Sequence, residues 1–136
     1  MLNIDTSSAI ALVSENSPER HSLRSYIQLR GGLMVMTETA LTEFNDIVRL
    51  IAGSREFARA QRFLSRVLAI LDDPSVRALN LRPTKNLEAS DIIILGTGDR
   101  LKIVTVTADA RAVRACKAQG VDVQVHEHRP VPLKGV

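Results

Sequence analysis

The fold is indicated most clearly by residues 102–109, which read KIVTVTAD. β-Branched side chains dominate this run and predict a strand, and Asp109 follows it at the start of a helical pattern that continues to Gln119. The amino terminus repeats the arrangement, because the short apolar run Leu2–Ile4 ends in Asp5. If the two strands lie side by side in a parallel sheet, both carboxylates meet at the edge where ligands of such sheets bind.

The rest of the chain alternates between strand and helix patterns. Residues 33–36 form a continuous apolar run typical of a buried strand, and residues 121–125 alternate in the manner of an edge strand. The segments predicted to be helical are 6–14, 18–31, 37–53, 55–71, 75–80, 90–95 and 109–119. This order predicts an α/β fold, a three-layer α/β/α sandwich with a mostly parallel central sheet. We expect a domain over residues 1–126 and an irregular tail over 127–136.

One predicted helix is ambiguous. Residues 92–95 read IIIL, and periodicity alone does not distinguish a buried strand from a buried helix here. The cap residues Ser90 and Asp91, and the need for a crossover before the strand at 102–107, favour a helix. Gly96 and Gly98 weaken that interpretation.

Length and composition favour a single domain inside the cell. A chain of 136 residues suits one domain, and a single cysteine, Cys116, excludes an internal disulfide framework. Cys116 is interpreted as a small core residue. The amino terminus does not resemble a signal peptide, and no apolar stretch reaches the roughly 18 residues that a transmembrane helix needs. The sequence therefore predicts a cytoplasmic protein without a membrane segment.

The charge pattern suggests an acidic site on a basic surface. The net charge is +3, and taking away the four negative charges of Asp5, Glu43, Asp91 and Asp109 leaves +7 for the remaining residues. There are 14 arginines and 4 lysines, and guanidinium groups suit phosphate oxygens. An ordinary solvated basic surface explains the same composition, so both interpretations stay open.

Each of the four acids also has a purely structural explanation. Asp5 and Asp109 could be helix N-caps, and Asp91 would lie in the first turn of a helix, where the helix dipole favours an acid. Glu43 falls on the flank of the apolar face of its helix and could be a surface residue. Carboxylates that converge at the end of a sheet commonly hold Mg²⁺ or Mn²⁺ for phosphate chemistry. Thr107 would lie on the same side.

The order and spacing of these acids resemble those of the PIN-domain nucleases. The matching segments are IDTSSAI at 4–10, TETALTEF at 37–44, SDIIILGTGDRL at 90–101 and VTVTADARAV at 104–113, so the resemblance spans residues 2–126. It implies that Asp5, Glu43, Asp91 and Asp109 bind Mg²⁺ or Mn²⁺ and are catalytic. It also implies supporting roles for Thr107 and for a hydroxyl at Thr6 or Ser7.

The same resemblance implies an activity and partners. The implied activity is metal-dependent hydrolysis of RNA phosphodiesters, and many small PIN proteins are toxins that are inhibited by an antitoxin protein and form homodimers. This chain departs from the family pattern at Ser7, where many relatives have Asn, and at Ala112 and Val113, where many have an aromatic residue. Leu95–Asp99 replaces an alanine-rich helix. The alternative is a catalytically inactive PIN-like module that binds RNA or protein.

Three further patterns have competing interpretations. The arginines at 55, 59, 62 and 66 could bind nucleic acid, or they could form a solvated or partner-binding face. His126 and His128 could hold Zn²⁺, although alternation at a strand end is the simpler explanation. Asp99 is expected to be a solvated residue at a helix end, and residues 96–99, GTGD, are too short for a phosphate-binding loop.

Overall fold

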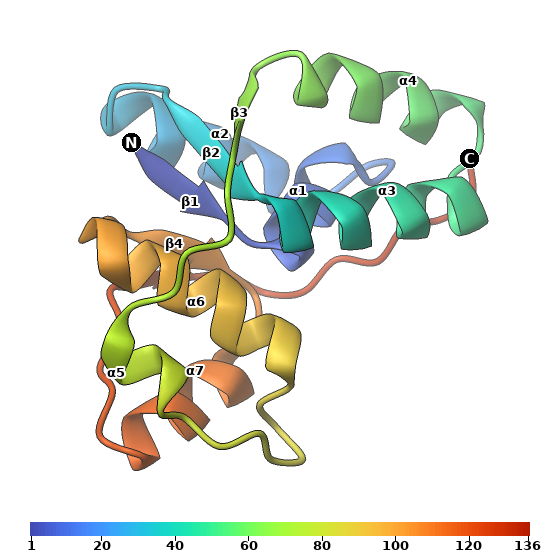
Figure 1. The fold of residues 1–136 in the computed structure, drawn as a ribbon. Helices are drawn as coiled ribbons and strands as arrows, with labels where there is room; N and C mark the ends of the chain where they lie inside the picture. The colour runs from blue at the N-terminus through green and yellow to red at the C-terminus, as the bar shows by residue number, and fades with distance from the viewer.

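The computed structural model describes residues 1–136 as a parallel sheet covered by helices on both faces (Figure 1). The strands are β1 (Leu2–Ile4), β2 (Met34–Thr37), β3 (Val67–Ile70), β4 (Thr105–Thr107) and β5 (Val125–Glu127). The helices are α1 (Thr6–Val13), α2 (Arg20–Leu29), α3 (Glu38–Ile51), α4 (Ser54–Leu64), α5 (Val76–Leu79), α6 (Ala89–Leu101) and α7 (Ala110–Ala118). The predicted three-layer α/β fold is confirmed.

All strand pairs are parallel, in the order β3-β2-β1-β4-β5. The central strand β1 pairs with β2 through Leu2 and Met34, and with β4 through Ile4 and Val106. Because β1 and β4 are parallel neighbours, their carboxyl ends lie at the same edge of the sheet. Asp5 and Asp109 therefore follow neighbouring strands.

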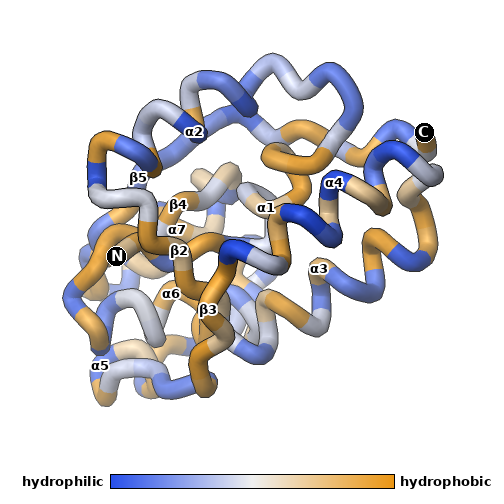
Figure 2. Tube along the Cα trace, turned by 90° about the horizontal axis from the view of Figure 1, so that it is seen from above, coloured by the Kyte–Doolittle hydropathy of each residue, from blue (hydrophilic) through white to orange (hydrophobic).

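Two hydrophobic cores hold the layers together. The larger core packs α1 to α4 on one face of the sheet, where Phe44 meets Phe63 edge to face with 5.6 Å between ring centroids. The smaller core joins α5, α6 and α7 and includes the buried Cys116. In the hydropathy view (Figure 2) the strands are mostly hydrophobic, whereas α3 alternates along its length, as expected of a helix with one buried face.

The helix predicted over residues 55–71 was wrong beyond Leu64. There α4 ends, and Val67–Ile70 pairs with β2 as the edge strand β3, so the sheet has five strands and not the four expected. The spacing of Ala60, Leu64, Val67 and Leu71 suits one face of a helix, yet Val67–Ile70 is also a short apolar run. These residues form a strand and not a helix because they pair with the exposed edge of β2, a tertiary contact that the local sequence does not show.

The last strand lies further along the chain than predicted. Val121 and Val123 are buried in the smaller core without joining the sheet, and β5 begins at Val125. Residues 125–127 pair with β4.

Helix α6 confirms the helical interpretation of residues 92–95, and its two glycines allow close packing. A Cβ on Gly96 would lie 2.7 Å from the side chains of Ala78 and Pro74. A Cβ on Gly98 would overlap Thr105 Oγ1 on β4. The glycines therefore let α6 approach α5 and the sheet, and they do not loosen the helix.

Residues 128–136 have no regular secondary structure but pack on the larger core through Val131. The buried carboxylate of Glu56 on α4 accepts hydrogen bonds from the backbone N–H groups of Lys134, Gly135 and Val136, and from that of Glu15. None of the helices has the length and apolar character that crossing a membrane requires.

Candidate active site

Asp5 is fixed in place by three hydrogen bonds. It directly follows β1 and caps α1, where its Oδ1 accepts from the backbone N–H of Thr6 at 2.8 Å. Its Oδ2 accepts from Ser7 Oγ at 2.9 Å and from Thr107 Oγ1 at 2.7 Å. The residue is only 8% exposed. The carboxylate therefore has one defined orientation.

The charge of Asp5 has no cationic partner, since no ion pair involves this carboxylate. Burial raises its pKa, and the negative charge of Asp109 raises it further, although the hydrogen bonds from Thr107, Ser7 and Thr6 act in the opposite direction. A buried carboxylate close to a second carboxylate is stabilised either when it is protonated or when a cation binds next to it.

Ser7 and Thr107 connect Asp5 to Asp109 through the turn after β4. The hydroxyl of Ser7 accepts from the backbone N–H of Ala108 at 3.0 Å, and that of Thr107 accepts from the backbone N–H of Asp109 at 3.0 Å. Asp109 Oδ1 caps α7 by accepting from the N–H of Ala112 at 3.0 Å. The predicted N-cap role of Asp109 is confirmed, and its second oxygen has no hydrogen bond within the protein.

Asp91 lies in the first turn of α6 and also has a structural role. Its Oδ2 accepts from the backbone N–H of Glu88 at 2.9 Å as half of a capping box. Burial raises its pKa to about 6, and the charges of Asp109 and Asp5 add to that effect while the Glu88 hydrogen bond opposes it. The charge of Asp109 thus raises the pKa of both Asp5 and Asp91, which indicates that the three side chains are electrostatic neighbours.

Glu43 joins the group from the opposite side, on α3. Its Oε1 accepts from Thr6 Oγ1 at 2.9 Å, and Thr6 follows Asp5 directly. The side chain is half-buried, as its position on the helix flank predicts. The fold thus brings together the four acids from the end of β1 and from α3, α6 and α7.

A polar cavity of about 290 Å³ opens beside two of the acids. Asp91, Asp109 and Glu88 line it with Lys85, Asn86 and Arg111, and no hydrophobic residue takes part. Lys85 and Arg111 were not predicted as site residues. Arg111 could have been noticed two positions after Asp109, whereas Lys85 lies in the loop between α5 and α6 and carries no sequence signal.

The donor set suits a hard divalent cation. No group of three or more His, Cys, Asp or Glu side chains is close enough to hold an ion as the side chains stand. Mg²⁺, however, keeps several water ligands and is commonly bound by one or two carboxylates together with substrate phosphate oxygens. Neighbouring carboxylates that lack a cationic partner are side chains of the kind that could provide those ligands.

The arginines predicted to bind nucleic acid do not converge on the acids. Arg55 and Arg59 approach Glu15 at 3.4 and 3.5 Å. Arg62 and Arg66 line a separate cleft between α2 and α4, and Arg66 lies beyond the end of α4.

The remaining polar patterns have structural partners. His126 stacks on Tyr26 with 3.7 Å between ring centroids, and His128 Nε2 lies 2.6 Å from Ser8 Oγ, so the two histidines have different surroundings.

The expectation of a solvated Asp99 was wrong, because its side chain is 11% exposed.

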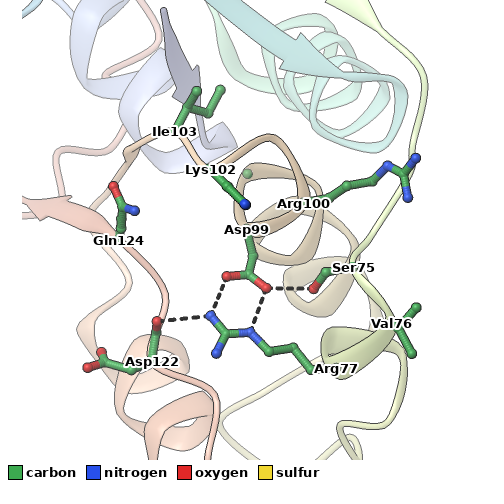
Figure 3. A pocket seen from close by; sticks show the side chains of 10 residues that line it. Ser75, Val76, Arg77, Asp99, Arg100, Lys102, Ile103, Asp122 and Gln124 are labelled. Atoms are coloured by element: carbon green, nitrogen blue, oxygen red, sulfur yellow. Dashed lines mark hydrogen bonds and ion pairs between the residues drawn. The ribbon is translucent and has the colours of Figure 1, made fainter.

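Asp99 is paired inside a cavity of about 630 Å³ (Figure 3). Arg77 donates to both of its oxygens at 2.5 and 2.8 Å, and Ser75 Oγ donates at 2.6 Å. Asp99 is thus an internal anchor between α5 and α6, a role that only the tertiary contact reveals.

Comparison with known proteins identifies both a sequence family and a fold. Residues 16–135 match the family described as "Protein of unknown function (DUF1308)". The match includes Glu43, Asp91 and Asp109 but begins after Asp5.

Several solved structures are similar over nearly the whole chain. The DNA-bound VapBC from Salmonella typhimurium has a TM-score of 0.67 at 20% identity, covering 93% of this chain and 96% of that one. VapBC2 from Rickettsia felis, bound to a promoter DNA fragment, has a TM-score of 0.67 at 13% identity, with coverages of 93% and 98%. The sarcin-ricin loop cleaving toxin VapC20 from Mycobacterium tuberculosis has a TM-score of 0.59 at 15% identity, with coverages of 91% and 99%. These similarities show that the chain has a PIN-like fold.

Proposed function

The chain belongs to the DUF1308 family of proteins of unknown function. We propose that this member is a divalent-metal-dependent nuclease, most simply an endoribonuclease that hydrolyses RNA phosphodiesters. The observation that carries the proposal is the proximity of Asp5, Asp91 and Asp109 without a cationic partner: burial raises the pKa of Asp5 and of Asp91, and the charge of Asp109 raises both further. The fold similarity to VapC20, a toxin that cleaves the sarcin-ricin loop, supports the same activity.

Each acid has a distinct task in this proposal. Asp5, held by Thr6, Ser7 and Thr107, is the central ligand, because three donors fix its orientation. Asp91 and Asp109 would complete the set of metal ligands. Glu43, on α3, would hold a second ion or orient the attacking water. Mg²⁺ or Mn²⁺, when bound, supplies activation of water and stabilises the charge that develops on the phosphate and the leaving oxygen.

The cavity beside the acids provides substrate contacts. Lys85 and Arg111 line it with Asp91 and Asp109, and neither has an ion-pair partner. Their positive charges suit the phosphate group next to the cleaved bond, which the acids alone would repel.

A biological role as the toxin of a toxin–antitoxin module is part of the proposal. Two of the similar structures are VapBC assemblies, so we expect an antitoxin protein as a partner and a homodimer as the assembled form. Expression that arrests growth, and no arrest by the Asp5→Asn variant, would support that role.

A catalytically inactive module that binds RNA or protein is the second candidate. It is favoured by the absence of a preformed group of three metal-binding side chains. Cleavage separates the candidates, because the inactive module binds RNA without cutting it.

The test is a cleavage assay on a pool of single-stranded and structured RNA with Mg²⁺ or Mn²⁺, with EDTA as the metal-free arm. Attack by water forms no 2′,3′-cyclic phosphate and does not need the 2′-hydroxyl of RNA. A substrate with a 2′-deoxy nucleotide at the mapped cleavage site should therefore still be cut. Products ending in a 2′,3′-cyclic phosphate, or cleavage in EDTA, would point to a contaminating ribonuclease and against the proposal.

A further inference from the structure

A cleft with a high density of positive charge lies between α2 and α4, away from the four acids. Its volume is about 550 Å³, and its lining includes Gln28 and the four arginines Arg24, Arg59, Arg62 and Arg66. Met34, the first residue of β2, also lines it and pairs with Leu2. Asp5 is three residues further along β1, so the cleft floor is about 10 Å from the acidic edge at ~3.3 Å per residue.

The positive charge of this cleft is largely uncompensated. Of the four arginines only Arg59 has a carboxylate nearby, Glu15 at 3.5 Å, which Arg55 shares. The neighbouring Arg20 is affected by the same excess of positive charge: burial lowers its pKa, and the charges of Arg59 and Arg24 lower it further. The side chains that line the cleft therefore carry more positive than negative charge.

The cleft also has an apolar floor. Leu12, Ile27, Met34 and Phe63 line it, and each is less than 10% exposed. A concave site with apolar side chains beside a few polar groups is typical of small-ligand binding, and the volume lies within the range of about 300–1,000 Å³ for such sites. The Gln28 amide adds one donor and one acceptor group.

We propose that this cleft binds a nucleoside phosphate, with the phosphate on the arginines and the base against the apolar floor. Guanidinium forks bind phosphate oxygens in pairs. The choice of RNA as the source rests on the proposed function: the carboxylates at the cleavage site repel a polyanion, so cations outside that site, such as these arginines, are expected to supply part of the binding energy. The free mononucleotide is the other source of the same chemistry, and the experiment distinguishes the two.

The experiment measures binding of a labelled single-stranded RNA by fluorescence anisotropy in EDTA, with the Arg62→Glu/Arg66→Glu double variant. Both residues are exposed, and unchanged thermal unfolding verifies the fold. We expect at least a tenfold loss of affinity, and a slope of log K against log salt that is smaller by about 1–2, in line with two lost phosphate contacts. The control Arg114→Glu, exposed on α7 without an ion pair, should change the affinity less than twofold.

Competition assigns the source of the ligand. Displacement of the RNA by a free mononucleotide from wild type, but not from the double variant, indicates a site for free nucleotide. No displacement, together with the loss in the double variant, indicates a nucleotide within the RNA chain.

The inference would be overturned by equal losses for the double variant and for Arg114→Glu, or by equal affinity for an abasic sugar-phosphate strand. The inference would also be overturned if the double variant bound the RNA normally and an acidic peptide displaced that RNA. That result would assign the cleft to a protein partner. Because EDTA prevents metal-dependent cleavage, the binding assay does not depend on nuclease activity. If binding depends on the arginines but no cleavage is found with metal, the proposed cleft is supported and only the proposed nuclease activity is contradicted.

Discussion

Thr107 donates a hydrogen bond from Oγ1 to Oδ2 of Asp5 at 2.7 Å, and the two residues are 102 positions apart in the chain. The parallel pairing of Ile4 with Val106 places them opposite each other at the ends of β1 and β4. The same hydroxyl accepts the backbone N–H of Asp109. A single threonine therefore links the two carboxylates that follow the central strands.

Replacing Thr107 with valine should impair cleavage more than folding. Valine keeps the shape of the side chain but removes the donor to Asp5 and the acceptor for Asp109. Residues that orient metal ligands typically contribute about 10- to 100-fold to activity or metal affinity, so we expect a loss of that size in the single-turnover cleavage rate. Thr107→Ser, which keeps the hydroxyl, should stay near wild type. Equal rates for valine and threonine would show that the bond does not position Asp5.

Glu56 should be one of the most sensitive positions for stability. Its buried carboxylate accepts backbone hydrogen bonds from Glu15 and from residues 134–136. Glu56→Gln replaces one acceptor oxygen with an amide NH₂ that faces other donors. Because buried unsatisfied groups cost about 1–3 kcal/mol each, we expect a loss of roughly 2–4 kcal/mol in urea unfolding. Glu127→Gln, exposed on β5, is the matched control and should change stability by less than about 0.5 kcal/mol.

The contribution of Glu56 should depend on pH in a defined direction. Burial alone would raise its pKa, but the backbone hydrogen bonds from Lys134, Glu15, Gly135 and Val136 lower it below its usual value of 4.5. A carboxyl with a lower pKa in the folded state stabilises the fold above its unfolded pKa, and loses that effect as the pH falls through the folded pKa. The difference between wild type and Glu56→Gln should be complete at pH 7 and shrink below about pH 4.5. A difference that grew toward low pH in urea unfolding would contradict this sign.

Gly98→Ala tests the close contact between α6 and β4. In an ordinary helix this substitution stabilises by about 1 kcal/mol. Here the new Cβ would overlap Thr105 Oγ1 and lie 3.0 Å from Asn3 Nδ2, so we expect a destabilisation of about 1–3 kcal/mol. Combining it with Thr105→Ala should cost less than the sum of the two single changes, because the overlap is then relieved. A more stable Gly98→Ala protein would show that α6 tolerates a wider gap to the sheet.

The sequence predicted the features that depend on local pattern. Asp5 and Asp109 could be placed because each follows an apolar run, and Glu43 because it lies on the flank of a periodic helix. Their roles as metal ligands and catalytic groups stay a proposal, because three or more of these side chains do not come close enough together to hold an ion.

The features that were missed depend on contacts between distant residues. Val67–Ile70 satisfies both a helical and a strand pattern, and only the free edge of β2 selected the strand. Asp99 looked solvated because its partner Arg77 is 22 positions away. The hydrogen bonds of Glu56 reach 41 residues back to Glu15 and 78 to 80 residues forward to residues 134–136, and no local pattern predicts them.

The most direct test of the proposed site is RNA cleavage with Mn²⁺ by wild type, Asp5→Asn and Asp46→Asn. Asp46 is an exposed acid on α3 that pairs only with Arg49, so its variant removes the same charge outside the site. We expect wild type and Asp46→Asn to cleave equally, and Asp5→Asn to lose at least 100-fold in rate, about 2.7 kcal/mol of transition-state stabilisation. Cleavage by Asp5→Asn at the wild-type rate would contradict the claim that these converging carboxylates form the catalytic site.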